Sequence, residues 1–325
     1  MNRSTQKLLV TLLKLVIAVY TVAYVYYKIF VGYTLDYWVQ EYRHTVAGVN
    51  WVLVALATVL LLANWGLEAV KWRYLMRAHE SVSLWLALKA VFSGTTISLI
   101  TPNRIGEYAG RVVHLEKSDK VQAAFTTMVG SLSQLCVTVL LGCLCFMLQL
   151  DVLLPQYNLT SRMVILMCTV VMLLSLVLYY NMWVLGAVTS RFPLLHRFNR
   201  YLHVFEQYDM GQLTHVLLFS AVRYAVFTLQ YLLLIHAFHV SISSSAALLM
   251  IPVIFLAQSL LPSFALTELG MRGPSAVFFF SLSATGLSQA GIMLSAYSLW
   301  IINLIFPSLL GLILLLRVRF SSVVS

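Results

Sequence analysis

The sequence predicts an all-α fold, a polytopic membrane helix bundle, on three observations. Hydrophobic residues occupy 61% of the 325 positions and charged residues only 10%, whereas roughly a quarter of the residues of a soluble domain are charged. The hydrophobic residues form long continuous runs, as membrane-spanning helices require. The 21 Lys and Arg residues lie mostly in the short segments between these runs, a distribution typical of membrane insertion. We therefore expect a single membrane domain over residues 1–325 and no nucleic-acid partner, despite a net charge of +10.

Apolar runs of two lengths divide the chain. Runs near the roughly 20 residues that a bilayer requires are Leu8–Lys28, Trp51–Val70, Val121–Leu148, Met163–Val188, Leu213–Phe238 and Ile292–Leu316. Two shorter runs, Leu84–Ile100 and Ala246–Leu261, each end next to a proline that charged residues follow. The sequence thus predicts about 6 full spans plus 2 short membrane helices.

Two related motifs follow the short runs. The first, at 101–111, reads TPNRIGEYAGR, and the second, at 262–273, reads PSFALTELGMRG. In both motifs a glutamate precedes an arginine by four residues, which places the two side chains together on a helix with the acid on its favourable, N-terminal side. We expect these motifs to form the functional centre.

The distribution of basic residues predicts how the chain crosses the membrane. Positive residues favour the cytoplasmic side, and this rule places both chain termini, Arg77 and Lys120 in the cytoplasm. Leu84–Ile100 must then enter the membrane and return, and the same parity makes Ala246–Leu261 enter from outside. We expect an inverted repeat with two re-entrant helices, built from residues 51–150 and 213–318, an architecture common among secondary transporters.

A plain count of eight spans remains open. It makes both short runs cross the membrane and keeps the two termini on the same side. It also places three basic residues outside, namely Arg191, Arg197 and Arg200.

Arginine chemistry suggests what the motifs bind. A charge at membrane depth costs several kcal/mol unless it is paired or hydrated, so Glu107 should neutralise Arg111, and Glu268 should neutralise Arg272. Arg104 is then the candidate ligand for an anion, since a guanidinium can hold two phosphate oxygens at once. The helix start after Pro102 would add free N–H groups. The expected substrate-binding residues are Thr101, Asn103, Arg104, Glu107, Arg111, Arg223, Thr267, Glu268 and Arg272.

Other readings of these polar residues stay open. The two Glu–Arg pairs fit structural clamps that let short helices end inside protein, and mid-span Arg223 fits either a binding site or a structural pair. Glu68, Lys71, Trp72 and Arg73 end the second span, where such residues ordinarily anchor at lipid headgroups. The four cysteines lie in apolar runs, and we expect no metal ligands, catalytic residues or cofactor.

The segment Thr101–Glu107, followed by Arg111, resembles the signature of the lysylphosphatidylglycerol synthase transmembrane-domain family, also called flippase-like integral membrane proteins. Residues 71–73, 223–224 and 262–272 extend the resemblance over essentially the whole chain. The resemblance implies a bundle with two re-entrant helices that moves lipids, including aminoacylated phosphatidylglycerol, between leaflets. Full-length synthases add a soluble aminoacyl-transferase domain. This sequence has no counterpart of it, so we do not expect synthesis of lysyl lipid.

We therefore expect an integral membrane flippase or transporter for an anionic or glycosylated phospholipid, in a cell membrane such as the bacterial inner membrane. One alternative is an intramembrane enzyme that acts on a polyprenyl phosphate. That activity would need paired carboxylates or a metal, whereas the acids at plausible membrane depth are Glu68, Glu107 and Glu268. Another alternative is a non-transporting assembly partner in envelope biogenesis.

Overall fold

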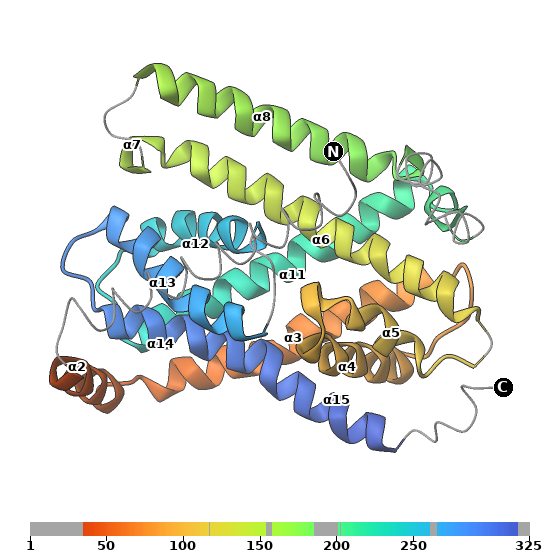
Figure 1. Ribbon diagram of the computed structural model, residues 1–325, viewed down its shortest axis with the longest axis horizontal. Helices are drawn as coiled ribbons and strands as arrows, with labels where there is room; N and C mark the ends of the chain where they lie inside the picture. The colour runs from red at the N-terminus through yellow and green to blue at the C-terminus, as the bar shows by residue number, and fades with distance from the viewer. Residues whose placement is uncertain are drawn as a thin grey trace, which may run out of the picture.

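The computed structural model describes residues 35–116, 118–153, 158–184, 201, 203–260 and 265–317, without the side chains of 35–38, 158–160 and 265–269. Every regular element in this part of the chain is a helix (Figure 1), which confirms the predicted all-α bundle. Besides the helices discussed below, the described chain forms α2 (Leu35–Ala47), α7 (Leu150–Leu153) and the short 3₁₀ segment η4 (His203–Glu206).

Five helical segments of the described chain are long and apolar enough to cross a membrane. They are α3 (Trp51–Met76), α6 (Lys120–Leu148), α8 (Asn158–Tyr180), α11 (Met210–Ala237) and the continuous helix from Gln289 to Leu316. Each overlaps a predicted span. The sixth predicted span, Leu8–Lys28, lies outside the described residues.

Polar side chains fix where three long helices begin. Asn50, Asp119 and Asp209 each accept hydrogen bonds from backbone N–H groups in the first turn of α3, α6 and α11. The first turn of a helix has no internal acceptor for these groups, so such caps stabilise a helix start by about 1 kcal/mol each.

The last span changes its helical geometry midway. It consists of α14 (Gln289–Trp300), one π-helical turn η5 (Ile301–Ile305), and α15 (Phe306–Leu316). Pro307 has no N–H with which to continue the bond to Asn303 four residues earlier, which accounts for the break in the α-helical pattern. The wider turn holds Asn303, whose side chain is buried in the bundle.

The first short run forms a helical hairpin. Helix α4 spans Leu84–Ile100 as predicted, a 3₁₀ turn η2 covers Pro102–Arg104, and α5 spans Gly106–Val112. The chain reverses here, so that α4 and α5 lie in close contact. A Cβ on Gly110 would lie 2.7 Å from the Gly94 Cα, and Ser93 Oγ lies 2.7 Å from His114 Nε2. Side chains at either glycine would force α4 and α5 apart.

The second short run also leads into a helix that packs against it. Helix α12 spans Ser244–Ser259 and contains Pro252, and α13 spans Ala265–Ser283. Gln258 Nε2 donates to Ser275 Oγ over 3.0 Å, which ties the end of α12 to α13. Residues 261–264, at the start of the second motif, lie outside the described residues.

Each short helix packs against a long helix from the other half of the chain. A Cβ on Gly311 of α15 would overlap the Phe92 carbonyl oxygen of α4, and Thr96 of α4 donates to the Ser308 carbonyl oxygen of α15 over 2.7 Å. A Cβ on Gly142 of α6 would lie only 2.5 Å from the Leu256 Cβ of α12. The two halves therefore interlock through two glycine contacts.

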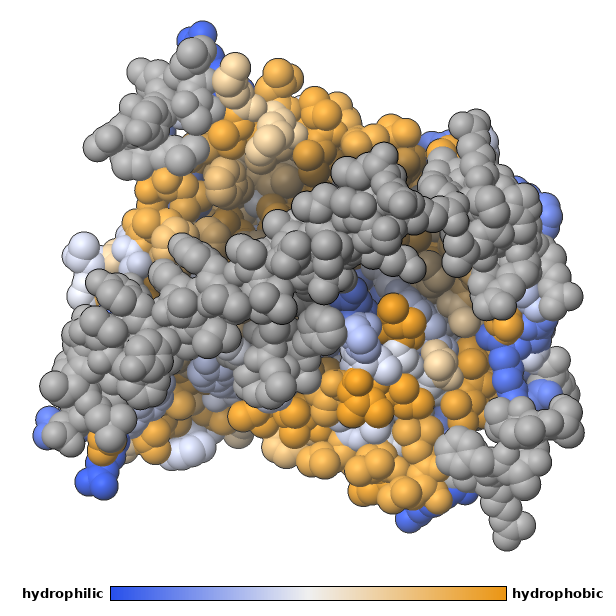
Figure 2. All heavy atoms as spheres, in the orientation of Figure 1, coloured by the Kyte–Doolittle hydropathy of each residue, from blue (hydrophilic) through white to orange (hydrophobic). Residues whose placement is uncertain are grey.

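The exterior is strongly hydrophobic. Figure 2 shows hydrophobic residues over much of one face, with hydrophilic residues gathered towards the two ends of the long helices and in a region near the middle of that face. Helix α8 lies along the outer edge beside α6 (Figure 1). Leu166, Met167 and Leu173 of α8 are each more than half exposed. Such a surface suits a lipid environment, and the five candidate spans make this a multi-pass membrane protein.

Candidate functional site

A cluster of charged side chains lies buried where α3, α5 and α11 meet. Glu68 of α3 binds Lys71 Nζ at 2.8 Å, Arg111 at 2.7 Å and Arg223 at 3.2 Å. The side chains of Glu68, Lys71 and Arg111 are at most 5% exposed. Because a buried charge is stable only when it is paired, Glu68 is the shared partner that makes burial of Lys71 and Arg111 tolerable.

Arg111 has a second carboxylate partner in its own helix. It pairs with Glu107, four residues earlier, as the spacing predicted. Glu107 is 23% exposed and Glu68 is 5% exposed, so the more deeply buried partner of Arg111 is the one on α3. We call Glu68, Lys71, Glu107, Arg111 and Arg223 the buried ion cluster.

The prediction that Lys71 and Trp72 anchor α3 at the headgroups is wrong. Lys71 is 2% exposed and Trp72 is 1% exposed. Lys71 Nζ donates to the Gly130 carbonyl oxygen and to Ser220 Oγ, both over 3.3 Å. The indole of Trp72 donates to Thr127 Oγ1 over 2.9 Å. The end of α3 is therefore enclosed by α6 and α11 on the side that carries Lys71 and Trp72, and these two side chains face protein.

Next to the buried ion cluster lies a cavity of about 350 Å³, within the roughly 300–1,000 Å³ usual for small-molecule sites. Residues from α3, α6 and α11 reach it near the midpoints of these helices. Three arginines border it, namely Arg104 from η2, Arg223 from α11 and Arg272 from α13. The two motifs and mid-span Arg223, which are far apart in sequence, therefore meet at this central cavity.

Arg223 connects the central cavity to the buried ion cluster. Its Nε donates to Asn64 Oδ1 over 2.7 Å and one terminal nitrogen donates to Gln134 Oε1 over 3.3 Å. The guanidinium carbon also lies 5.3 Å from the ring centre of Trp65, a favourable cation–π distance. With Glu68 as an ion partner, Arg223 is both a structural pair and part of the cavity wall. The structural pair that its sequence position left open is present, and a binding role stays a prediction.

Arg104 occupies the tip of the α4–α5 hairpin in an unusual backbone conformation. Arg104 has φ 56° and Asn103 has φ 50°, a left-handed region that costs about 1–2 kcal/mol for residues other than glycine. Asparagine tolerates it better than arginine. Arg104 is half-buried and makes an interaction of its own. The expectation that Arg111 and Arg272 are paired while Arg104 alone is left for an anion therefore does not hold.

Two other residues of the first motif have structural contacts. Thr101 Oγ1 donates to the Ile97 carbonyl oxygen over 3.0 Å and accepts from the Gly106 N–H over 2.9 Å. That N–H belongs to the first residue of α5, so the side chain of Thr101 already occupies a group that we expected to attract an anion. Asn103 supplies the left-handed turn.

The second motif is described only in part. Arg272 borders the central cavity, while the side chains of Thr267 and Glu268 lie outside the described residues. The predicted Glu268–Arg272 pair therefore stays a prediction.

Three amides of this region, Asn64, Gln258 and Asn303, were not singled out from the sequence. Asn64 Nδ2 donates to Asn303 Oδ1 over 2.6 Å and lies 3.5 Å from Gln230 Oε1, which links α3, η5 and α11. Gln134 and Gln258 also border the central cavity. Each is a polar residue within an otherwise apolar run, and that pattern is the signal that could have found them.

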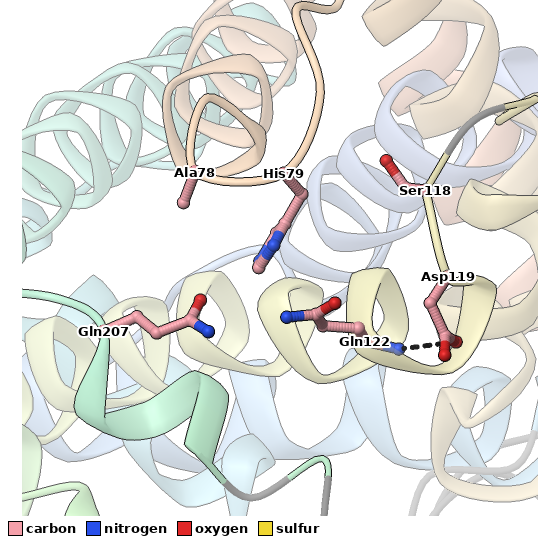
Figure 3. Close-up of a pocket in the computed structure, with 6 residues that line it drawn as sticks. All are labelled: Ala78, His79, Ser118, Asp119, Gln122 and Gln207. Carbon is pink, nitrogen blue, oxygen red and sulfur yellow. Dashed lines mark hydrogen bonds between the residues drawn. The ribbon is translucent and has the colours of Figure 1, made fainter.

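A second, wider hollow lies at the ends of the helices (Figure 3). It measures about 550 Å³ and is lined by Ala78, His79, Ser118, Asp119, Gln122 and Gln207. Asp119 is occupied as the cap of α6 and His79 Nε2 lies 2.8 Å from Thr126 Oγ1. No cationic side chain is among the lining residues that the structure describes, so the arginines identify the central cavity as the candidate site. In the part of the chain described, no three His, Cys, Asp or Glu side chains group as metal ligands.

One comparison with known proteins gives a match. No curated protein and no solved structure matches the chain. A family model described as lysylphosphatidylglycerol synthase TM region matches residues 11–311, nearly the full length. The chain therefore belongs to the lysylphosphatidylglycerol synthase TM region family of membrane proteins, a family associated with lipid handling.

Proposed function

We propose that this protein is a lipid transporter of the flippase type, which moves an anionic phospholipid between the two leaflets of a membrane. The observation that carries the proposal is the central cavity bordered by Arg104, Arg223 and Arg272 at mid-span. Positive charge at that depth is costly and is typical of substrate pathways. Guanidinium groups bind phosphate oxygens in pairs and carry five N–H donors each, so these arginines can bind a lipid phosphate alongside their protein partners.

The other side of the cavity suits the remainder of a lipid. Trp65, Phe227, Phe255, Trp300 and Leu304 line it together with the arginines. Aromatic and aliphatic surface favours acyl chains and the glycerol backbone, whereas the arginines favour the headgroup. Charged and apolar walls in one cavity therefore match an amphiphile better than a water-soluble ion.

Two inverted units, residues 51–150 and 213–318, form part of the proposal. The glycine contacts support it, because α15 packs on α4 and α6 packs on α12, as a two-fold relation between the units would require. In this arrangement α4 and α12 are re-entrant helices whose tips meet at the cavity. We propose the bacterial inner membrane as the location, with both termini in the cytoplasm, from the family and the distribution of basic residues.

A reconstitution assay tests the function. Liposomes that contain the purified protein and labelled phosphatidylglycerol should lose their leaflet asymmetry faster than protein-free liposomes. Arg272→Ala should slow this movement by an order of magnitude or more, since loss of a charged hydrogen-bonding group costs about 1.5–3 kcal/mol. Arg77→Ala is the matched control, because Arg77 is exposed at the end of α3. Mass spectrometry of the same lipid distinguishes transport from the enzymatic alternative, which would change its mass.

A further inference from the structure

The buried ion cluster has more cations than carboxylates. Its cations are Lys71 of α3, Arg111 of α5 and Arg223 of α11, and its carboxylates are Glu68 of α3 and Glu107 of α5. Every ion pair that these five residues make with the described chain lies within the cluster. With all five groups ionised, the cluster therefore carries one positive charge in excess, which is strongly disfavoured at membrane depth.

Lys71 is the group of the cluster that can remove this excess. A guanidinium keeps its proton in proteins, and protonation of a glutamate would enlarge the excess. Loss of one proton from Lys71 leaves two arginines opposite two carboxylates, which is a balanced set. Lysine is also a basic residue whose protonation state responds readily to burial, and Lys71 is 2% exposed. The cluster therefore contains a site that can bind and release a proton.

The groups around the Lys71 nitrogen suit both protonation states. The nitrogen lies 2.8 Å from Glu68 Oε2, and 3.3 Å from both the Gly130 carbonyl oxygen and Ser220 Oγ. Ser220 Oγ in turn lies 2.6 Å from Ser133 Oγ. A hydroxyl can accept a hydrogen bond from an ammonium or donate one to a neutral amine. Ser220 can therefore serve as a partner of Lys71 whether or not Lys71 carries the proton.

Arg223 connects this proton site to the central cavity. It binds Glu68 at 3.2 Å, and its side chain, which is 21% exposed, borders the cavity. A phospholipid phosphate bound by Arg223 would add one negative charge to the set. Three cations would then face two carboxylates and one phosphate, so the set is balanced if Lys71 keeps its proton. Without the lipid, it is balanced if Lys71 has lost that proton.

We infer that Lys71 binds one proton together with each lipid, so that the protein carries an anionic phospholipid and a proton across the membrane in the same direction. The inference rests on the proposed function and deepens it by naming an energy source, a proton gradient. The Lys71 amine takes up a proton from water on one side and releases it to water on the other, so that only an N–H bond forms and breaks. Because the charges of the phosphate and the proton cancel, the transported pair is electrically neutral.

A pH gradient across phosphatidylcholine proteoliposomes tests the coupling. With a difference of about one pH unit, labelled phosphatidylglycerol should accumulate about tenfold in the leaflet on the alkaline side, since one proton accompanies each lipid. Protein-free vesicles under the same gradient measure uncatalysed redistribution. Equal distribution between the leaflets, reached by a protein that moves the lipid, would overturn the inference but leave the proposed function standing. No movement with or without the gradient would overturn the proposed function itself.

Lys71→Met tests the assignment of the proton to this residue, because methionine is unbranched and uncharged. Two arginines and two carboxylates remain in the cluster, so the variant should fold. In weakly buffered detergent solution with a pH indicator, phosphatidylglycerol should add about one proton per bound lipid to the wild-type protein and none to Lys71→Met. Lys120→Met is the matched control, because Lys120 begins α6 outside the cluster, and it should take up protons as the wild type does.

Two outcomes of the proton measurement would contradict the inference. Proton uptake by a folded Lys71→Met protein equal to that of the wild type would assign the proton to another group. Lipid binding by the wild-type protein without any proton uptake would exclude coupling, and this result requires no variant to fold.

Discussion

The two helical hairpins carry the same Glu–Arg spacing but use their arginines differently. In the α4–α5 hairpin, Arg111 is buried between Glu107 and Glu68 and contributes to the packing of α5 on α3. In the α12–α13 hairpin, Arg272 borders the central cavity. Both short helices begin at a serine cap, Ser83 and Ser243, so the local similarity is real. Equal spacing in the two motifs therefore does not imply equal roles.

The two hairpins also differ in how closely their helices pack. Gly110 of α5 contacts the backbone of Gly94, while a Cβ on Gly270 of α13 would meet no atom of the described residues within 4 Å. The first hairpin is a tightly closed unit held by an ion cluster. In the second, Met271 stands at the position that corresponds to Gly110, and the glycine one residue earlier, Gly270, has space around it among the described residues.

The largest expected effect concerns Glu68. Glu68→Ala should destabilise the protein by about 3–5 kcal/mol, because it leaves buried Lys71 and Arg111 without their most buried partner. Glu107→Ala should cost only about 1 kcal/mol, since Glu107 is partly exposed and Arg111 keeps Glu68. Denaturant unfolding of the purified variants measures both values. Equal losses would mean that the cluster is not centred on Glu68.

The glycine contrast predicts a smaller effect. Gly110→Ala should destabilise by about 1–3 kcal/mol, because the new methyl group would overlap the backbone of α4. Gly270→Ala should be neutral or stabilising by up to about 1 kcal/mol, since alanine is the better helix former and its side chain has space. A comparison of melting temperatures decides this, and a larger loss for Gly270→Ala would reverse the distinction between the hairpins.

The smallest effect is a pH dependence of the first hairpin. Burial, with a contribution from nearby Lys89, lowers the pKa of His114 below its ordinary value of 6.5. His114 contributes stability that is present above the pKa of the unfolded chain and is lost as the pH falls through 6.5 towards the lower folded value. The free energy of unfolding, measured at about unit steps between pH 8 and pH 5, should fall more steeply for the wild-type protein than for His114→Gln. The same pH dependence of the free energy of unfolding in both proteins would show that His114 does not cause it.

Hydrophobic run length predicted most of the fold, because a bilayer dictates how many apolar residues a helix needs. Leu84–Ile100 forms a helix with the expected bounds, and the expected break lies between it and Gly106, where α5 begins. The chain reversal after Leu84–Ile100 was predicted from the basic residues on either side of it, Arg77 and Lys120. These features depend on residues close together in sequence.

The buried ion cluster could not be predicted in this way. Glu68 and Lys71 stand at the end of an apolar run, where basic and aromatic residues ordinarily face headgroups. Their burial depends on Ser220 and Gly130, which belong to helices far along the chain. Run length and spacing describe one helix at a time, so they identify the charges but not the tertiary contacts that enclose them.

The most direct test of a phosphate-binding cavity is a paired measurement on Arg104 variants, namely melting temperature and lipid movement in the same preparations. Arg104→Ala should still fold, with a single cooperative melting transition, and lose most transport of phosphatidylglycerol. Arg104→Gly should melt higher, because glycine removes the left-handed backbone cost of about 1 kcal/mol, and should transport equally poorly. Arg104→Lys should restore only part of the transport, since an ammonium lacks the two-pronged geometry. Full transport by a stably folded Arg104→Ala protein would contradict the account.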